Sequence, residues 1–366
     1  MSSSRQTVGI VFGGRSGEHP VSVRSSRFVF ESLDHSRFAP VLIGIDRAGD
    51  WHLLSEAEYA DVGPEVHAEA GLGVVPVRSA GRCALFSPKR PRAALPTIDV
   101  IFPILHGPYG EDGTIQGLLD LIDVPYVGVG VLGAALCMDK DVCKRLLREA
   151  GIPVVPFIAA SARNWARDAD TVRQGAAALG RTVFVKPASL GSSLGVSRVA
   201  DPAGPALDAA IAAALALDAK VIIERAIDGR ELECAVLGND EPLASVVGEI
   251  VPGEAFYSYD DKYAADSQAE LHIPADLDHV THARVRDAAI RAFRVLECSG
   301  MARVDFFLDR ATGELYVNEL NTIPGFTAIS MYPKLWEATG IPGAALVTRL
   351  VELAQERSAG RRCMKA

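Results

Sequence analysis

The chain has 366 residues, 49% of them hydrophobic and 23% charged, a composition typical of a folded protein with room for two or three domains. Its formal net charge of −9 argues against a nucleic-acid partner, because phosphate backbones are bound by clustered positive charge. No run of about 18 apolar residues and no apolar signal segment occurs, so neither a membrane-spanning helix nor a membrane partner is predicted. Six scattered cysteines form no C-x-x-C pair and no cluster with histidine, which favours reduced thiols in a cytoplasmic protein.

The first third of the chain alternates short apolar strands with helices. Strands are predicted at residues 8–12, 41–45 and 100–105, and helices at 21–33 and 114–122. This alternation predicts an α/β fold with a parallel or mostly parallel sheet, whose ligand loops follow the carboxyl ends of the strands. Residues 57–96, rich in Gly, Pro, Ala and Arg, are interpreted as peripheral hairpins and loops. We expect one domain over residues 1–128.

A glycine-rich boundary near residues 128–133 separates this region from the rest of the chain. Asp139 is placed to cap a helix that stops at Gly151 and Pro153. Further helices are predicted at residues 170–179, 205–217 and 276–298, and strands at TVFVKP, KVIIERAI, ELECAVLG and PLASVVGEIV. The last sheet element is a predicted hairpin, MARVDFFLD–RATG–ELYVNEL. We divide this part into a central domain, 129–224, and a C-terminal domain, 225–366.

The predicted hairpin carries three oxygen donors. Glu319 and Asn321 are two residues apart, so they leave their strand on the same face, and Asp305 lies in the opposite strand. Carboxylate and amide oxygens without His or Cys suit a hard cation such as Mg²⁺, which is usually completed by water and substrate phosphates. The alternative is a solvated strand end.

A lysine-bearing strand precedes a loop of small residues in FVKPASLGSSLGVSRV. The strand delivers Lys186 to a loop that includes Ser192 and Ser193. Backbone N–H groups of such a loop can close on phosphate oxygens, and the lysine adds a point charge. It is not a Walker-type loop, because the lysine precedes the glycines. A flexible hairpin tip with a coincidental lysine is the alternative.

A strand-to-strand hinge occurs in VIIERAIDGRELEC. A buried strand ends in Glu224, passes through Ala226 and Ile227, and resumes with Glu231. Backbone groups and one carboxylate at such a hinge can hold the edge of an adenine, and a second carboxylate can hold ribose hydroxyls. The alternative is a linker with surface acids.

Two loops of the first region carry candidate substrate-binding residues. Glu18 follows a glycine turn in GGRSGEHPVSV and could hold an ammonium group, and His106 follows a buried strand in LHGPYGEDG and could hold a carboxylate. A histidine in a glycine-rich loop is more often an ordinary surface residue.

Together, a magnesium site, a phosphate loop, an adenine hinge and a separate small-molecule domain indicate an ATP-dependent activating enzyme. Their order resembles that of the D-alanine–D-alanine ligases of the ATP-grasp superfamily. The matching segments run from residue 13 to about 331: GGRSGEHPVSV, LHGPYGEDG, MDK, VKPASLGSSLGVS, IIERAIDGRELECAVL, DKY, MARVDFFL and NELNTIPGFT. The resemblance implies a three-domain ATP-grasp architecture with a Rossmann-like N-terminal domain, a homodimer, and the ligation of two D-alanines with ATP during peptidoglycan synthesis.

The resemblance also implies residue roles. ATP would be bound by Lys140, Lys186, Ser192, Ser193, Glu224, Arg225, Ile227, Glu231 and Lys262, and two Mg²⁺ (or Mn²⁺) ions by Asp305, Glu319 and Asn321. The first D-alanine would be bound by Glu18 and His106, with Glu18, Ser192 and Tyr263 hydrogen-bonded to one another. Arg303 and the Gly325 N–H would form the oxyanion hole, and Ser330 with the Met331 backbone would hold the second carboxylate.

Two positions depart from the family pattern, which usually has an acid where Pro20 stands and more often a leucine where Met331 stands. Pro20 could alter the entry of the first helix and the geometry of Glu18. Two rival interpretations remain. The first is a D-alanine–D-lactate ligase or another ATP-grasp ligase, and the second is a non-catalytic nucleotide sensor. An intact set of Asp305, Glu319 and Asn321 argues against the sensor.

Overall fold

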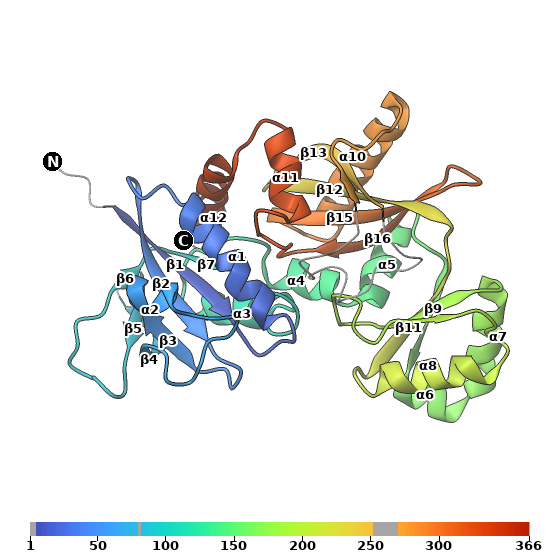
Figure 1. Cartoon of the computed structure of the whole chain (residues 1–366), viewed down its shortest axis with the longest axis horizontal. Helices are drawn as coiled ribbons and strands as arrows, with labels where there is room; N and C mark the ends of the chain where they lie inside the picture. Colours follow the sequence, from blue (N-terminus) through green and yellow to red (C-terminus); the bar gives the residue numbers. More distant parts are fainter. Residues whose placement is uncertain (1–4, 80–81, 252–269, 366) are drawn as a thin grey trace.

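The computed structural model of the chain describes residues 5–79, 82–251 and 270–365, arranged around three β-sheets (Figure 1). The first sheet lies in the N-terminal region, the second forms a projecting lobe, and the third lies between them (Figure 1). Within the described ranges, no helix is long and apolar enough to cross a membrane.

The N-terminal sheet has seven strands in the order β6-β5-β4-β3-β2-β1-β7. Their bounds are β1 Gln6–Gly13, β2 Phe38–Ile45, β3 Trp51–Leu54, β4 Leu72–Ser79, β5 Arg82–Phe86, β6 Thr97–Ile98 and β7 Val100–Pro103. The predicted strands at 8–12, 41–45 and 100–105 are β1, β2 and β7, and they pair in parallel as expected. The interpretation of residues 57–96 as peripheral hairpins and loops is confirmed for β4 and β5, which form an antiparallel hairpin that extends this sheet towards its edge.

Helices of the N-terminal region are α1 His19–Ser32, α2 Glu56–Ala60 and α3 Thr114–Leu121. Pro20 lies in the first turn of α1, where its missing N–H costs no intrahelical bond, so the helix begins without disturbance. The buried face of α1 packs against β1 in a core that includes Phe12, Val23 and Val29.

The central sheet is antiparallel, with strands in the order β10-β9-β11-β8. Its strands are β8 Phe157–Ser161, β9 Val183–Pro187, β10 Ser197–Val199 and β11 Lys220–Arg225, and its helices are α6 Ala162–Arg167, α7 Ala169–Leu179 and α8 Pro205–Leu215. Val183 and Val185 of β9 pack with Leu207 and Ile211 of α8 in a separate core. This lobe delivers Lys186 and Glu224 from adjacent, hydrogen-bonded strands.

The C-terminal sheet is also antiparallel, in the order β14-β13-β12-β15-β16. Its strands are β12 Gly229–Gly238, β13 Leu243–Val251, β14 Glu270–His272, β15 Gly300–Asp309 and β16 Leu315–Asn321, accompanied by α10 His279–Val295 and α11 Met331–Ala338. The predicted hairpin is therefore present as β15 and β16. The expectation of a mostly parallel sheet in the N-terminal region is wrong beyond β2, β1 and β7, because the pairs from β2 to β6 are antiparallel.

Helices α4, Val131–Met138, and α5, Lys140–Glu149, belong to the same core as the C-terminal sheet. Cys137 and Leu147 are buried among Val304, Val317 and Phe293 of that core. The predicted cap is confirmed, because the Asp139 side chain accepts hydrogen bonds from the N–H groups at the start of α5. Helix α4 was not predicted, because its glycine-rich start was interpreted as a boundary.

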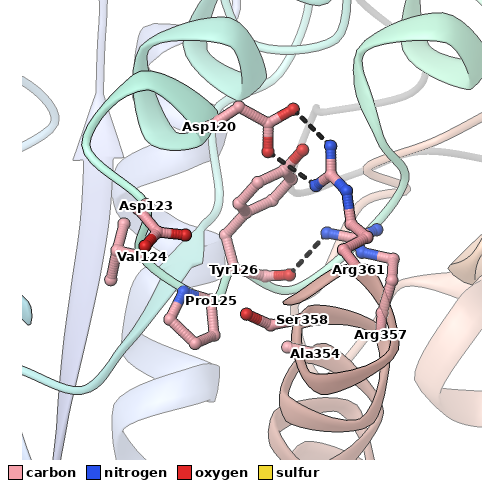
Figure 2. A pocket seen from close by; sticks show the side chains of 9 residues that line it. All are labelled: Asp120, Asp123, Val124, Pro125, Tyr126, Ala354, Arg357, Ser358 and Arg361. Carbon is pink, nitrogen blue, oxygen red and sulfur yellow. Dashed lines mark hydrogen bonds and ion pairs between the residues drawn. The ribbon is translucent and has the colours of Figure 1, made fainter. Parts of the chain in front are cut away.

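The last helix, α12 Gly343–Lys365, returns to the N-terminal region and packs beside α1 and β7. Figure 2 shows the hollow where it meets the loop around Tyr126. There Arg361 donates two hydrogen bonds of 2.7 Å to Asp120, and Arg357 donates one of 2.9 Å to the Tyr126 carbonyl. A single apolar core joins α12 to the N-terminal and C-terminal sheets, so the loops of these two sheets are held in fixed relation.

Candidate active site

The β15–β16 hairpin gathers the predicted metal-binding residues on one face. Asp305 is directly opposite Glu319 and Arg303 directly opposite Asn321, and side chains of such partners point to the same side of a sheet. The pairing shifts by one residue after this point, because Asn318 is an extra residue of β16 without a counterpart in β15. That bulge returns the outer part of β16 to apolar pairing and confines the polar face to its carboxyl end.

Arg303 is the centre of an ionic cluster on this face. Its Nε and Nη2 donate hydrogen bonds of 2.7 and 2.8 Å to Asp305, and Nε lies 2.9 Å from the Glu233 carboxylate. Burial alone would lower the pKa of Arg303, but Asp305 and Glu233 outweigh it and raise that pKa, so the guanidinium stays charged. These bonds use Nε and Nη2, and Nη1 still has two N–H groups for a ligand.

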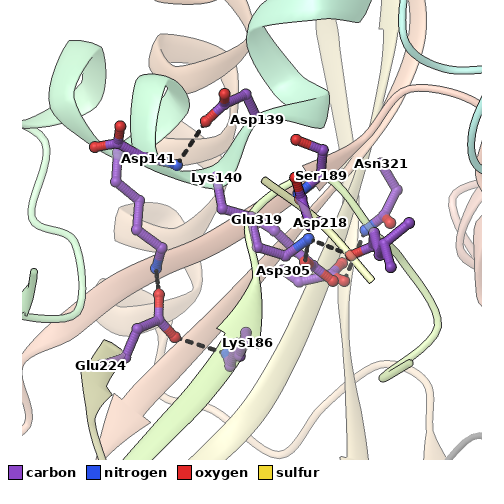
Figure 3. Close-up of polar contacts among 12 residues, drawn as sticks. Asp139, Lys140, Asp141, Lys186, Ser189, Asp218, Glu224, Asp305, Glu319 and Asn321 are labelled. Atoms are coloured by element: carbon purple, nitrogen blue, oxygen red, sulfur yellow. Dashed lines mark hydrogen bonds and ion pairs between the residues drawn. The ribbon is translucent and has the colours of Figure 1, made fainter. Parts of the chain in front are cut away.

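The residues on this face fit a hard cation. Within the described residues no three His, Cys, Asp or Glu side chains are grouped for a metal, and the hairpin instead offers two carboxylates and one amide. Such a partial oxygen set suits Mg²⁺, which retains waters and is completed by phosphates. The Asn321 amide N–H now donates to Asp305 over 2.9 Å, and a half-turn of the carboxamide would present its oxygen (Figure 3).

Glu224 is held between two lysines. Its buried carboxylate lies 2.6 Å from the Lys186 ammonium (Figure 3). The Lys144 ammonium lies 2.7 Å from the other side of the same carboxylate. Burial would raise the pKa of Glu224, but the two ammonium groups outweigh burial and hold that pKa at about 2. Two positive charges share one negative charge, so the cluster keeps a net positive charge suited to phosphate.

Lys140 connects α5 to the phosphate-loop candidate and to the hairpin. Its backbone N–H donates to the Ala188 carbonyl over 2.9 Å and its ammonium donates to the Leu190 carbonyl over 2.7 Å. The same ammonium lies 3.5 Å from Glu319. The lysine therefore lies between the loop expected to hold phosphates and the carboxylates expected to hold the metal.

The loop after β9 places Ser192 on Glu18. The Ser192 hydroxyl donates a hydrogen bond to the Glu18 carboxylate, which is buried with only 7% of the residue exposed. Ser192 and Ser193 both have the left-handed conformation, with φ of 53° and 58°, which turns the loop sharply towards the N-terminal region. Gly107 has a φ of 74°, which favours glycine, and a Cβ there would lie 2.7 Å from a Glu18 oxygen.

His106 is buried beside Glu18, and both of its ring nitrogens have protein partners. Nδ1 lies 2.8 Å from the Ile323 carbonyl and Nε2 lies 3.0 Å from the Ser25 hydroxyl. Burial lowers the pKa of His106 more than Glu18 raises it, so the ring is neutral near pH 7. A direct bond from this ring to a substrate carboxylate would replace one of these contacts.

The segment after β16 leads from Thr322 to α11 and carries the remaining predicted residues. Ser330 is the N-cap of α11, and Met331 is the first residue of that helix. The Ser330 hydroxyl accepts a hydrogen bond from Thr327 N–H over 3.0 Å, and it would lie 3.1 Å from a Cβ added at Gly325. Gly325 and the helix start are thus neighbours, and backbone N–H groups of a helix start favour an anion.

The hinge between β11 and β12 follows the predicted order of residues. The Arg225 N–H donates to the Pro156 carbonyl over 2.9 Å, so this N–H is not directed at a ligand. The Arg225 side chain lies over the Tyr316 ring and donates to its hydroxyl over 3.0 Å. Ile227 is half-buried in the hinge, and Glu231 follows in β12, close enough to raise the pKa of Lys186. Lys262 and Tyr263 lie outside the described residues.

Sequence reasoning missed Lys144 and Glu111. Lys144 follows Lys140 by four residues in α5, so helical spacing could have indicated a second lysine on the same face. Glu111 accepts hydrogen bonds from Gly107 N–H over 2.9 Å and from Ile323 N–H over 2.8 Å. Its second contact joins residues 212 positions apart, and no local pattern indicates such a pair.

An antiparallel lobe that faces a second antiparallel sheet, with lysines on one side and carboxylates on the other, is the arrangement of the ATP-grasp class. The family described as D-ala D-ala ligase N-terminus matches residues 7–129, and the one described as D-ala D-ala ligase C-terminus matches residues 146–352. The chain therefore belongs to the D-alanine–D-alanine ligase family.

Individual proteins of this family are similar over nearly their full length. D-alanine–D-alanine ligase A of Chromobacterium violaceum is 49% identical, covering 96% of this chain and 95% of its own, and that of Escherichia coli K12 is 46% identical, covering 98% of each. The solved D-alanine-D-alanine ligase of Coxiella burnetii gives a TM-score of 0.84 at 34% identity, covering 99% of this chain and 97% of its own. VanG D-Ala:D-Ser ligase of Enterococcus faecalis gives a TM-score of 0.83 at 34% identity, covering 96% of this chain and 100% of its own.

Proposed function

We propose that this chain joins two D-alanine molecules to D-alanyl-D-alanine through an acyl phosphate, with ATP as the energy source, for peptidoglycan precursor synthesis. The observation that carries the proposal is the hydrogen bond between Ser192 and Glu18. It brings a buried acid of the N-terminal region, suited to an ammonium group, against the loop suited to phosphates. An amino acid held at Glu18 therefore has its carboxylate within reach of a bound nucleotide.

ATP would bind between the central lobe and the C-terminal sheet. Adenine would contact Glu224 and the hinge at Arg225 and Ile227, and ribose would contact Glu231. Lys140, Lys186 and Lys262, with Ser192 and Ser193, would bind the phosphates. Support comes from the net positive charge of the Lys144–Glu224–Lys186 cluster.

Two Mg²⁺ or Mn²⁺ ions would be held by Asp305, Glu319 and Asn321. When bound, they would neutralise charge on the phosphate oxygens during phosphoryl transfer. Lys140 lies between these carboxylates and the phosphate loop and would add a further positive charge on the same side.

In the first step, a carboxylate oxygen of the first D-alanine attacks the γ-phosphorus, and the bond to the β–γ bridging oxygen breaks to release ADP. In the second, the deprotonated amine of the second D-alanine attacks the acyl carbon, and the carbon–oxygen bond to phosphate breaks. Arg303 and the Gly325 N–H would stabilise the tetrahedral oxyanion, each by about 3 kcal/mol as judged from other oxyanion holes. The α11 start, Ser330 and Met331, would hold the second carboxylate. Tyr263 would complete the hydrogen-bonded set of Glu18 and Ser192.

The test is ADP release from ATP and Mg²⁺ with and without D-alanine, combined with identification of the product. D-alanine-dependent ADP release with formation of the dipeptide is expected. ADP release that does not respond to D-alanine would contradict the proposal and favour another ATP-grasp reaction. No ADP release at all would favour a nucleotide sensor.

A different acceptor is the second candidate, because the solved D-Ala:D-Ser ligase of Enterococcus faecalis is as similar in fold and identity as the solved D-alanine-D-alanine ligase of Coxiella burnetii. We favour an amine acceptor rather than D-lactate because the sequence contains the Lys262–Tyr263 pair. An amine must lose its proton to attack, whereas a hydroxy acid competes best at low pH. Product analysis with D-alanine, D-serine and D-lactate present together from pH 6 to 9 distinguishes the three. Predominant ester at every pH would contradict an amine acceptor.

We further infer a cytoplasmic homodimer. Small-molecule substrates that include ATP are consistent with that compartment, and the family resemblance carries the dimer. Light scattering of the purified protein measures its mass directly, and a monomeric mass at assay concentration would contradict the dimer.

A further inference from the structure

The backbone of Ile323, in the segment after β16, is hydrogen-bonded through both its carbonyl and its N–H to the loop that follows β7. The Ile323 carbonyl accepts a hydrogen bond of 2.8 Å from His106 Nδ1, and the Ile323 N–H donates one of 2.8 Å to Glu111. The Thr322 hydroxyl also lies 3.5 Å from the same Glu111 oxygen. His106 and Glu111 are 217 and 212 positions from Ile323 in the sequence.

A third contact anchors the other side of Gly325. The Phe326 N–H donates to the Ser25 hydroxyl over 3.2 Å, and Ser25 lies 3.0 Å from His106 Nε2. Since a carbonyl only accepts, Nδ1 carries the proton, and the neutral ring then accepts from Ser25 at Nε2. Ile323 and Phe326 flank Pro324 and Gly325. Ile323 is therefore bound to the loop of His106 and Glu111, and Phe326 is bound to α1.

Both oxygens of Glu111 and both nitrogens of His106 are thus engaged with the protein. Glu111 accepts from Gly107 and Ile323, and His106 contacts Ile323 and Ser25. Gly107 is also the residue packed on Glu18. The same short loop consequently contacts the first-substrate acid at one end and the segment of Gly325 at the other.

We propose that His106 and Glu111 are positioning residues that fix the Gly325 N–H relative to the substrate held at Glu18. The proposal rests on the proposed function, in which Gly325 donates to the oxyanion. It replaces the expected bond from His106 to a substrate carboxylate. A donor displaced by about 1 Å loses much of its effect on rate, by up to about 100-fold.

The first experiment compares Glu111→Gln with Asp112→Asn. Both convert an acid to its amide in the same loop, but Asp112 accepts from the Tyr109 and Thr114 N–H groups, which lie within three residues of it. The new amide at position 111 has one acceptor oxygen where the carboxylate has two, so the Ile323 or the Gly107 bond is lost. We expect kcat to fall at least about tenfold in Glu111→Gln, with ATP affinity within about twofold of wild type and Asp112→Asn nearly unchanged.

The second experiment separates positioning from substrate contact at His106. The amide nitrogen of Asn occupies the place of Nδ1, and that of Gln occupies the place of Nε2. If His106 acts through Ile323, His106→Asn retains more kcat than His106→Gln. Both variants are compared at saturating ATP, after a thermal melt and ATP titration confirm a folded site.

The results divide clearly. Equal kcat in Glu111→Gln and Asp112→Asn would overturn the proposal, and so would higher activity in His106→Gln than in His106→Asn. If Glu111→Gln fails to fold, Ser25→Ala removes the Phe326 anchor in its place and is expected to lower kcat severalfold without changing ATP affinity. An unchanged kcat there would also overturn it. A wild-type protein that releases no ADP with D-alanine would instead reject the proposed function itself.

Discussion

The proposed nucleotide side and the proposed first-substrate side of the site are built from different interactions. On the nucleotide side, Lys144, Glu224 and Lys186 form one chain of ion pairs, and Arg303, Asp305 and Glu233 form another. On the substrate side, the neutral ring of His106, serine hydroxyls and backbone groups dominate around Glu18. Phosphates and metal ions need fixed charge, whereas an amino acid that must react needs fixed position with little competing charge.

This difference predicts different sensitivities. Removing one charge on the nucleotide side leaves its partners uncompensated in a buried place, and such a change costs more than the loss of one neutral hydrogen bond. Substitutions that keep the shape of a side chain but remove its charge are therefore expected to lower activity severely on the nucleotide side and moderately on the substrate side.

The largest effect is expected for Glu319→Gln. The change keeps the shape of the side chain but removes a negative charge beside Lys140 and opposite Asp305. We expect kcat to fall by about 100-fold or more with an unchanged thermal melt. ADP release is measured over a range of Mg²⁺ concentrations, with Glu241→Gln, an exposed turn residue of the same sheet, as the control. Near wild-type kcat at ordinary Mg²⁺ would reject the metal assignment.

The next largest effect is expected for Lys186→Met. The change removes the ammonium that lies 2.6 Å from Glu224 at the start of the phosphate loop. We expect ATP affinity or turnover to fall by about 10- to 100-fold, and D-alanine binding at the first site to change much less. The surface variant Lys89→Met is the control, because that lysine lies in an exposed turn. Equal ATP affinity and activity in Lys186→Met would reject its role.

Lys144→Met tests the buried end of the same ion-pair chain. Lys144 is fully buried, and burial lowers its pKa against the opposing effect of Glu224. Without the Lys144 ammonium, Glu224 keeps only Lys186 as an ion-pair partner, and the positions of both side chains are less well fixed. We therefore expect ATP affinity to fall by about tenfold. Lys144→Arg, which keeps the charge, is expected to recover part of the loss. A Lys144→Met protein with unchanged ATP affinity would show that Lys186 alone fixes Glu224.

The sequence was sufficient for the parts of the site that depend on short-range geometry. Glu319 and Asn321 share a face because strand side chains alternate, and Asp305 joins them because a short turn brings the next strand alongside. Asp139 could be assigned as a cap because a cap depends on two or three neighbouring N–H groups. Each of these inferences needed no knowledge of tertiary contacts.

What the sequence did not indicate depends on contacts between distant segments. The Asn318 bulge reflects how two strands fit, and the antiparallel extension of β4 and β5 reflects which sheet edge they meet. The bond from Glu111 to Ile323 exists only because the core shared with α12 holds two regions together. The spacing of Lys144 from Lys140 indicates a shared helix face, but a single sequence does not show that this face is buried against Glu224.

The smallest effect concerns pH and the substrate side. Burial and the nearby Glu18 charge raise the pKa of Glu111 from 4.5 to about 7, against the bonds from Gly107 and Ile323. The charged or titratable groups that face it are Glu18 from the α1 start, Arg303 from β15 and Cys137 from α4, with His106 in its own loop. Because the folded protein binds the Glu111 proton more tightly than the unfolded chain does, Glu111 favours folding most below pH 4.5. That contribution, roughly 3 kcal/mol at most, is lost as the pH rises through 7.

Activity should change in the opposite direction, because only the ionised carboxylate accepts from both Gly107 and Ile323. As pH rises from 6 to 8, we expect kcat at saturating substrates to increase severalfold while the melting temperature decreases. In Glu111→Gln both trends should weaken, since this side chain no longer titrates, whereas Asp112→Asn should keep them. Parallel profiles of kcat and melting temperature measure this. Wild-type trends that persist unchanged in Glu111→Gln would assign the titration to another group, such as the attacking amine.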